Sequence, residues 1–154
     1  MNPKIELLKI CIAVENTVSE IYDLFAARFP EQEEFWRGLA TEERGHARQF
    51  VVASSLKGSA ALPSSMQSAQ DALEYVRKVK REILENAGLQ PEDALKMAIF
   101  IEQTTVESFL DRMVLDETDG EMKRFYGSLM IEGKRHAEFL EERLSGMRQS
   151  GGQA

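Results

Sequence analysis

The sequence predicts an all-α chain that folds as a four-helix bundle of two antiparallel hairpins, joined by a long crossover with an additional helix. Three observations support this fold class. Apolar residues recur at the helical spacing of three to four positions along almost the whole chain, and no segment alternates as a strand does. Short breaks near Pro30 and Asp119 each divide two long helical stretches. A segment rich in glycine, serine and proline separates the two pairs.

The first predicted hairpin contains a helix over residues 3–29 and a helix over residues 31–56. Pro30 ends the first of these, because proline lacks the backbone N–H donor and its ring clashes with the preceding turn. A link this short leaves the two helices side by side and antiparallel.

The crossover begins with the segment LKGSAALPSSMQS at residues 56–68, whose composition predicts a loop. Residues 69–87 then predict the additional helix, which Gly88 ends as a C-terminal cap. The basic cluster RKVKR at residues 77–81 lies on this amphipathic helix next to Glu82. Such a cluster indicates a solvated helix face rather than a nucleic-acid surface.

The second predicted hairpin contains a helix from Pro91 to about residue 118 and a helix over residues 120–147. Pro91 suits a first helical turn, because the backbone N–H groups there have no acceptor within the helix and the N–H that proline lacks is not needed. Glu92 and Asp93 follow it, at the helix end where the dipole favours acidic side chains.

Composition and charge limit the function classes. We expect one domain over residues 1–147 and a flexible tail, RQSGGQA, over residues 148–154. The formal net charge of -7 argues against a general nucleic-acid-binding protein. No apolar run approaches the ~20 residues of a membrane span, and the N-terminus meets glutamate too early for a secretory signal. The single cysteine, Cys11, excludes an internal disulfide, so we expect a cytoplasmic protein.

Polar residues interrupt the apolar stripes of all four long predicted helices. They are Glu15, Glu43, His46, Glu102, Glu132 and His136. At about 1.5 Å per residue, they lie roughly 20 to 26 Å from the turn of their own hairpin, so we expect them at one level of one bundle. Burying an ionised carboxylate costs several kcal/mol, whereas a domain is stable by about 5 to 15 kcal/mol. Four such glutamates therefore need protonation, water or a bound cation.

A pair of divalent metal ions suits this set of side chains. Two ions balance four carboxylates, and two neutral histidines complete the ligands. Oxygen-rich ligation with one imidazole per metal favours iron or manganese over structural zinc. Bundles that hold two such ions take one Glu from each of two helices and a Glu-x-x-His motif from each of the others. Glu15 and Glu102 supply the first part, and Glu43-Arg-Gly-His46 supplies half of the second.

The two hairpins also resemble each other in sequence, which indicates a duplicated helical hairpin. VENTVSE at residues 14–20 matches IEQTTVE at 101–107, and WRGLATEERGH at 36–46 matches YGSLMIEGKRH at 126–136. This alignment puts Gly133 where the first hairpin has Glu43, so the second motif reads Glu-x-x-x-His. We expect a π-bulge near Gly133 to turn Glu132 toward the site by about 100°. If Glu132 points to solvent instead, the site is asymmetric or partly decayed.

In these motifs the chain resembles the ferritin-like superfamily and, within it, the rubrerythrin-related di-iron carboxylate proteins. AVENTVSEIYDLFA resembles the first rubrerythrin helix and ATEERGHARQFV the second, and the resemblance covers nearly all of residues 5–145. It implies a ferritin-like bundle with two iron ions, with manganese or zinc as the alternatives. It also implies a homodimer, and it places Tyr22 beside the metals as a partner of the site; the alternative for Tyr22 is an ordinary buried hydrogen bond.

Two departures from the family pattern bear on activity. Rubrerythrins carry a further glutamate where this chain has Thr105, and they carry a four-cysteine rubredoxin domain that the sequence lacks. Electrons must then come from a separate donor such as a rubredoxin-like protein. The resemblance implies an oxidoreductase that acts on peroxide or dioxygen. A ferroxidase or iron-binding protein is one alternative, and a non-catalytic bundle with a decayed or single-metal site is another.

Overall fold

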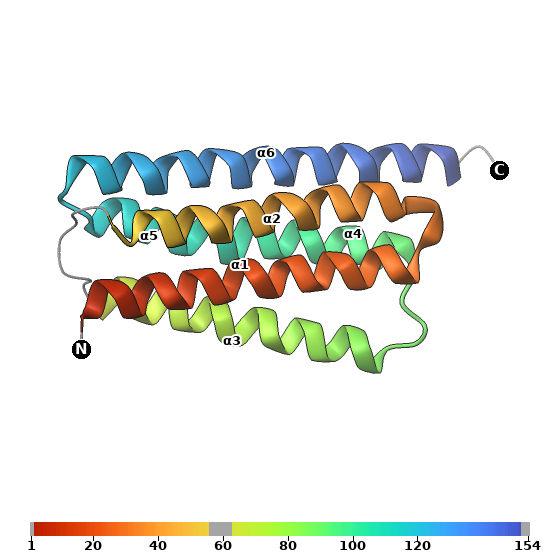
Figure 1. The fold of residues 1–154 in the computed structure, drawn as a ribbon. Helices are drawn as coiled ribbons and strands as arrows, with labels where there is room; N and C mark the ends of the chain where they lie inside the picture. Colours follow the sequence, from red (N-terminus) through yellow and green to blue (C-terminus); the bar gives the residue numbers. More distant parts are fainter. Residues whose placement is uncertain (1, 56–62, 152–154) are drawn as a thin grey trace.

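A computed structural model describes residues 2–55 and 63–151 of the protein (Figure 1). The predicted all-α class is confirmed, because the described residues form helices and turns without a strand. In chain order the elements are α1 (Pro3–Arg28), the 3-10 helix η1 (Pro30–Gln32), α2 (Glu33–Ala53), α3 (Pro63–Glu85), α4 (Pro91–Phe100), the π-helix η2 (Ile101–Val106), α5 (Glu107–Asp116) and α6 (Gly120–Gly151).

The helices lie side by side as an elongated bundle (Figure 1). Helix α1 packs against α2 and α3, whereas α6 packs against α4 and α5, and α3 contacts α5. Helices α2 and α6 run along one face of the bundle but contact each other more sparsely than these pairs do.

The helix ends follow local sequence signals. The side chain of Asn2 caps α1 by accepting a hydrogen bond from the backbone N–H of Lys4 at 3.0 Å. Pro30 follows the end of α1 as predicted, and residues 30–32 form a 3-10 turn, so α2 begins at Glu33 rather than residue 31. At α4, the backbone N–H of Gln90 donates to Asp93, which confirms the predicted start at Pro91.

Two predicted boundaries are wrong by four residues or more. Helix α3 begins at Pro63 rather than at residue 69, because proline suits a first helical turn and serine does not prevent continuation. Residues 56–62 of the predicted loop lie outside the described residues. Helix α6 continues to Gly151, so the chain is still helical at 148–151, where the tail was expected. The rest of that tail, residues 152–154, lies outside the described part of the chain.

The expected π-bulge near Gly133 is also wrong. Helix α6 is α-helical through Gly133. The π-helix instead lies in the other arm of that helical hairpin, at Ile101–Val106, and contains Glu102. A π-turn adds one residue to a helical turn and often lies at a functional site. This π-helix contains neither glycine nor proline, so no helix-breaking residue marks it in the sequence. The spacing of the apolar residues does not reveal it either.

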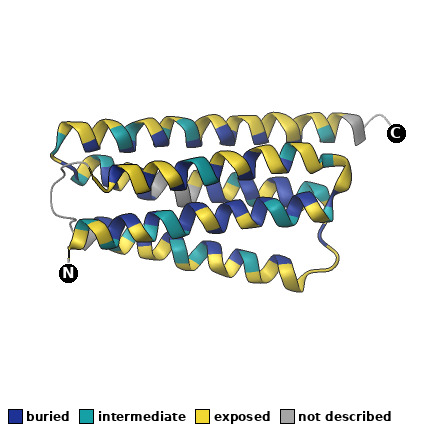
Figure 2. Ribbon diagram, viewed as in Figure 1, coloured by how far each residue is buried: buried dark blue, intermediate teal, exposed yellow. Residues whose placement is uncertain are grey.

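The core is formed by the inward faces of the α-helices, while their outer faces are exposed (Figure 2). Its largest fully buried side chains include Trp36, Tyr22 and Phe25, which form an aromatic cluster between α1 and α2. The Trp36 ring centroid lies 5.6 Å from that of Tyr22 and 4.8 Å from that of Phe25. This packing fixes the Tyr22 ring, which points toward the middle of the bundle. Among the described helices, none combines the length and the hydropathy that a bilayer crossing demands.

Candidate metal centre

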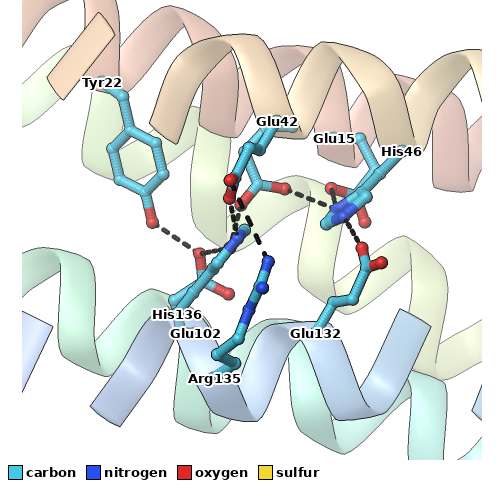
Figure 3. Close-up of polar contacts among 9 residues, drawn as sticks. Glu15, Tyr22, Glu42, His46, Glu102, Glu132, Arg135 and His136 are labelled. Atoms are coloured by element: carbon cyan, nitrogen blue, oxygen red, sulfur yellow. Dashed lines mark hydrogen bonds and ion pairs between the residues drawn. The ribbon is translucent and has the colours of Figure 1, made fainter. Parts of the chain in front are cut away.

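Five of the six predicted ligands are buried together in the middle of the bundle (Figure 3). They are Glu15 on α1, Glu43 and His46 on α2, Glu102 on η2 and His136 on α6. Helical spacing brings them there, because each lies on the stripe that its helix turns toward the core. The expected convergence of these five side chains on one level is therefore confirmed.

The five residues form two groups that share one member. One group is Glu15, Glu43 and His46, and the other is Glu43, Glu102 and His136; within each, one ligand atom per residue lies within 4.8 Å of the others. Oε2 of Glu43 lies 3.2 Å from Nδ1 of His46, and Oε1 of Glu43 lies 3.0 Å from Nδ1 of His136. Glu43 would therefore be a ligand shared by two metal ions, one held by each group.

The two histidines have corresponding positions on the two hairpins. Their rings are stacked, with centroids 5.6 Å apart and an angle of 18° between the planes. Nδ1 of His46 lies 3.7 Å from Oε2 of Glu15, and Nδ1 of His136 lies 3.7 Å from Oε1 of Glu102. Both imidazoles thus direct the same nitrogen toward the buried carboxylates.

The buried carboxylates fit a cation. Both oxygens of Glu15 and Oε2 of Glu102 are buried, and none of the three has a hydrogen-bond partner among the described residues. Burying such oxygens without a partner is costly, and native proteins rarely leave them so. Divalent metals bound by the two groups would satisfy all three oxygens.

Electrostatics at the site also favour a bound cation or a proton. Burial, followed by the charge of Glu43, raises the pKa of Glu15 well above its usual range. Burial lowers the pKa of His46, but the nearby carboxylates of Glu15 and Glu43 outweigh this effect and raise the pKa to about 11. The pKa of His136 rises to about 10, because Glu102 and Glu43 outweigh burial in the same way. Without a metal, protons on the histidines would offset the carboxylate charge.

Tyr22 lies directly beside this site. Its Oη donates a hydrogen bond of 2.7 Å to Oε1 of Glu102, between α1 and η2. Burial and the nearby charge of Glu102 raise the pKa of Tyr22 well above its usual range, so the hydroxyl keeps its proton. The phenol therefore holds one oxygen of Glu102 and leaves Oε2 without a partner.

The structure does not place Glu132 in either group. Its carboxylate contacts Nε2 of His46, the ring nitrogen that faces away from the buried carboxylates, and its side chain is 41% exposed. Glu42, which aligns with Glu132 in the duplicated sequence, makes the equivalent contact with Nε2 of His136. Nη2 of Arg135 lies 3.9 Å from Oε1, the other carboxylate oxygen of Glu42. The alignment of Glu42 with Glu132 was the signal that could have identified both. The side chain of Thr105, where the family has a further glutamate, lies outside the described part of the structure.

A surface groove leads to the second group. It has a volume of about 590 Å³ and lies between the first half of α2 and the second half of α6. Its apolar lining includes Phe35, Leu39 and Phe139, and His136 and Glu42 also line it. A small solute in this groove would reach the edge of the His136 ring.

The comparison with known protein families agrees with this site. The model of the Rubrerythrin family matches residues 6–144, which include all the residues of both groups. No curated protein and no solved structure gives a significant match to the chain. Because the match extends over most of the sequence, the chain belongs to the rubrerythrin family.

Proposed function

We propose that the protein is a di-iron carboxylate oxidoreductase, which reduces peroxide or dioxygen with electrons from a separate donor. The observation that carries this proposal is the carboxylate of Glu43, which directs one oxygen toward each histidine. A shared carboxylate and one imidazole per group suit a pair of iron or manganese ions. Zinc would fill the same positions without changing its oxidation state.

The roles of the residues follow from their positions. Glu15 and His46 would complete the ligands of one metal, and Glu102 and His136 those of the other. Two iron ions held there would supply the two electrons that, together with two protons from solvent, convert one hydrogen peroxide into two molecules of water. Tyr22 fixes Glu102 by its hydrogen bond, and burial of all the ligands excludes bulk water. The groove at His136 offers peroxide a path from solvent.

Peroxide turnover tests this proposal. Protein loaded anaerobically with ferrous iron should consume many equivalents of hydrogen peroxide when a rubredoxin-like reductant is present. Glu43→Ala should abolish this turnover, whereas Glu20→Ala should preserve it, because Glu20 is an exposed partner of Lys80. Consumption that stops once the bound iron is oxidised, despite excess reductant, would contradict the proposal.

Ferrous oxidation with retention of the iron is the second candidate function. The carboxylates of Glu31, Glu34 and Glu42 line the groove that reaches His136, and such a lining attracts cations. In that case the protein oxidises added ferrous iron with dioxygen over many turnovers and keeps ferric iron. A non-catalytic bundle would show neither activity, and elemental analysis would then find one metal, zinc or none.

We also propose that the protein forms a homodimer in the cytoplasm and receives electrons from a rubredoxin-like protein. The family resemblance supports the dimer, and exposed apolar side chains on α2 and α6 support it further: Val51, Val52, Ile131 and Phe139. Sedimentation of the purified protein tests the dimer. Reduction of the ferric protein by rubredoxin, measured against a buffer blank, tests the donor.

A further inference from the structure

Two glutamates at the surface contact the histidines from the side opposite the buried carboxylates (Figure 3). Glu132 on α6 contacts Nε2 of His46 on α2, and Glu42 on α2 contacts Nε2 of His136 on α6. Their side chains are 41% and 48% exposed, so each reaches inward from the surface. The two contacts therefore cross between the hairpins in opposite directions.

These two glutamates are equivalent in the duplicated sequence. Each precedes the histidine of its own helix by four residues, yet each contacts the histidine of the other helix. The next position along has diverged between the hairpins, to Glu43 in one and Gly133 in the other. A contact that occurs twice at equivalent positions, beside a position that has diverged, points to a role in the site.

We propose that Glu42 and Glu132 are positioning residues, which orient the opposite histidine so that its Nδ1 faces the metals. A neutral imidazole carries a proton on one nitrogen and a lone pair on the other. A carboxylate at Nε2 accepts a hydrogen bond from an Nε2–H group, and this leaves the lone pair on Nδ1 for a metal. The inference rests on the metal-binding part of the proposed function and does not depend on redox activity.

This role differs from that of a metal ligand. A ligand would lie on the Nδ1 side of His46, where Glu15 and Glu43 are. The carboxylate of Glu132 lies at Nε2, and the two nitrogens of an imidazole ring point in diverging directions. Glu132 therefore acts on the metal through His46. By the same geometry, Glu42 acts through His136 and joins it to Arg135 at the surface.

Proton–nitrogen correlation NMR of zinc-loaded protein tests the crossed arrangement. The chain has two histidines, so the ring nitrogens of each can be assigned. In the parent protein both Nδ1 atoms should be metal-bound, and both Nε2–H protons should exchange slowly. Glu132→Ala should remove the slow proton of His46 alone, and Glu42→Ala should remove that of His136 alone.

Zinc affinity provides the second measurement. Each alanine variant should still bind about two zinc ions, but about 10- to 100-fold more weakly, as is typical when a partner of a ligating histidine is lost. Glu42→Gln and Glu132→Gln keep an acceptor oxygen and should recover most of the affinity. Glu33→Ala on α2 and Glu138→Ala on α6 remove exposed acids that do not line the groove, and both variants should bind zinc like the parent.

The outcomes separate this inference from the proposed function. If the parent protein binds no zinc, both the positioning role and the metal-binding part of the proposed function are contradicted. If the parent binds zinc but each variant alters the histidine of its own helix, or neither histidine, only the inference is overturned. Loss of one zinc ion in Glu132→Ala would also overturn it, because that result would make Glu132 a ligand.

Discussion

The rings of His46 and His136 lie stacked in the core with their centroids 5.6 Å apart, and they come from equivalent positions of two similar hairpins. Each ring directs Nδ1 to the carboxylate of Glu43, which lies between them. A pair of equivalent half-sites thus shares one carboxylate, and the predictions below follow from that sharing.

Glu43 should matter to both metals, whereas Glu15 and Glu102 should each matter to one. Zinc titration of Glu43→Ala should show loss of both high-affinity sites, because its two oxygens belong to different groups. Glu15→Ala and Glu102→Ala should each retain one site. Glu20→Ala is the matched acidic control on α1, and equal losses in all four variants would show that the groups are assigned wrongly.

Tyr22→Phe should destabilise the metal-free protein by about 1–3 kcal/mol, because it leaves a buried oxygen of Glu102 without its donor. Urea unfolding of the metal-free form measures this change. Tyr75→Phe removes a hydroxyl that is less buried and should shift the midpoint much less. Equal stabilities of Tyr22→Phe and the parent would contradict the assigned hydrogen bond.

Gly133→Glu should tighten metal binding and destabilise the metal-free protein. Gly133 is buried in α6 at the position equivalent to Glu43, so the substitution adds a carboxylate opposite the existing one. An uncompensated buried charge costs several kcal/mol, which bound metal would offset. Thermal unfolding with and without zinc measures both effects. Gly133→Ala controls for helix propensity, and a Gly133→Glu protein with unchanged zinc affinity would refute the duplicated geometry.

Metal binding should release protons, and affinity should fall as pH falls. At pH 7 both histidines of the metal-free protein are protonated, because their pKa values are about 11 and about 10. Ligation requires neutral imidazoles, so protons compete with metal more strongly at lower pH. Zinc titration calorimetry in buffers of different ionisation enthalpy counts the released protons. A pH-independent affinity between pH 6 and 9, with no proton release, would show that the histidines are not ligands.

The sequence was sufficient to predict the fold class and five of the candidate ligands. Glu15, Glu43 and His46 interrupt apolar stripes of fixed period, and the distance of each from its hairpin turn follows from the helical rise. The duplication then paired Glu102 with Glu15 and His136 with His46. Those inferences depend on helical spacing and on the internal repeat, both of which can be read directly from the sequence.

The parts that were not predicted depend on how helices face one another. Glu42 lies on the exposed side of α2, and only the packing of α6 shows that it reaches His136. Glu132 was expected to enter the core by a bulge at Gly133, but the regular helix directs it to the outer nitrogen of His46. The π-helix at Ile101–Val106 depends on the surrounding packing, and no turn-forming residue marks it.

Anomalous diffraction from crystals loaded anaerobically with ferrous iron tests the central claim most directly. Two iron peaks should lie on either side of the Glu43 carboxylate, one within ligand distance of Nδ1 of His46 and the other within ligand distance of Nδ1 of His136. A single peak, or no peak at these nitrogens, would contradict the account.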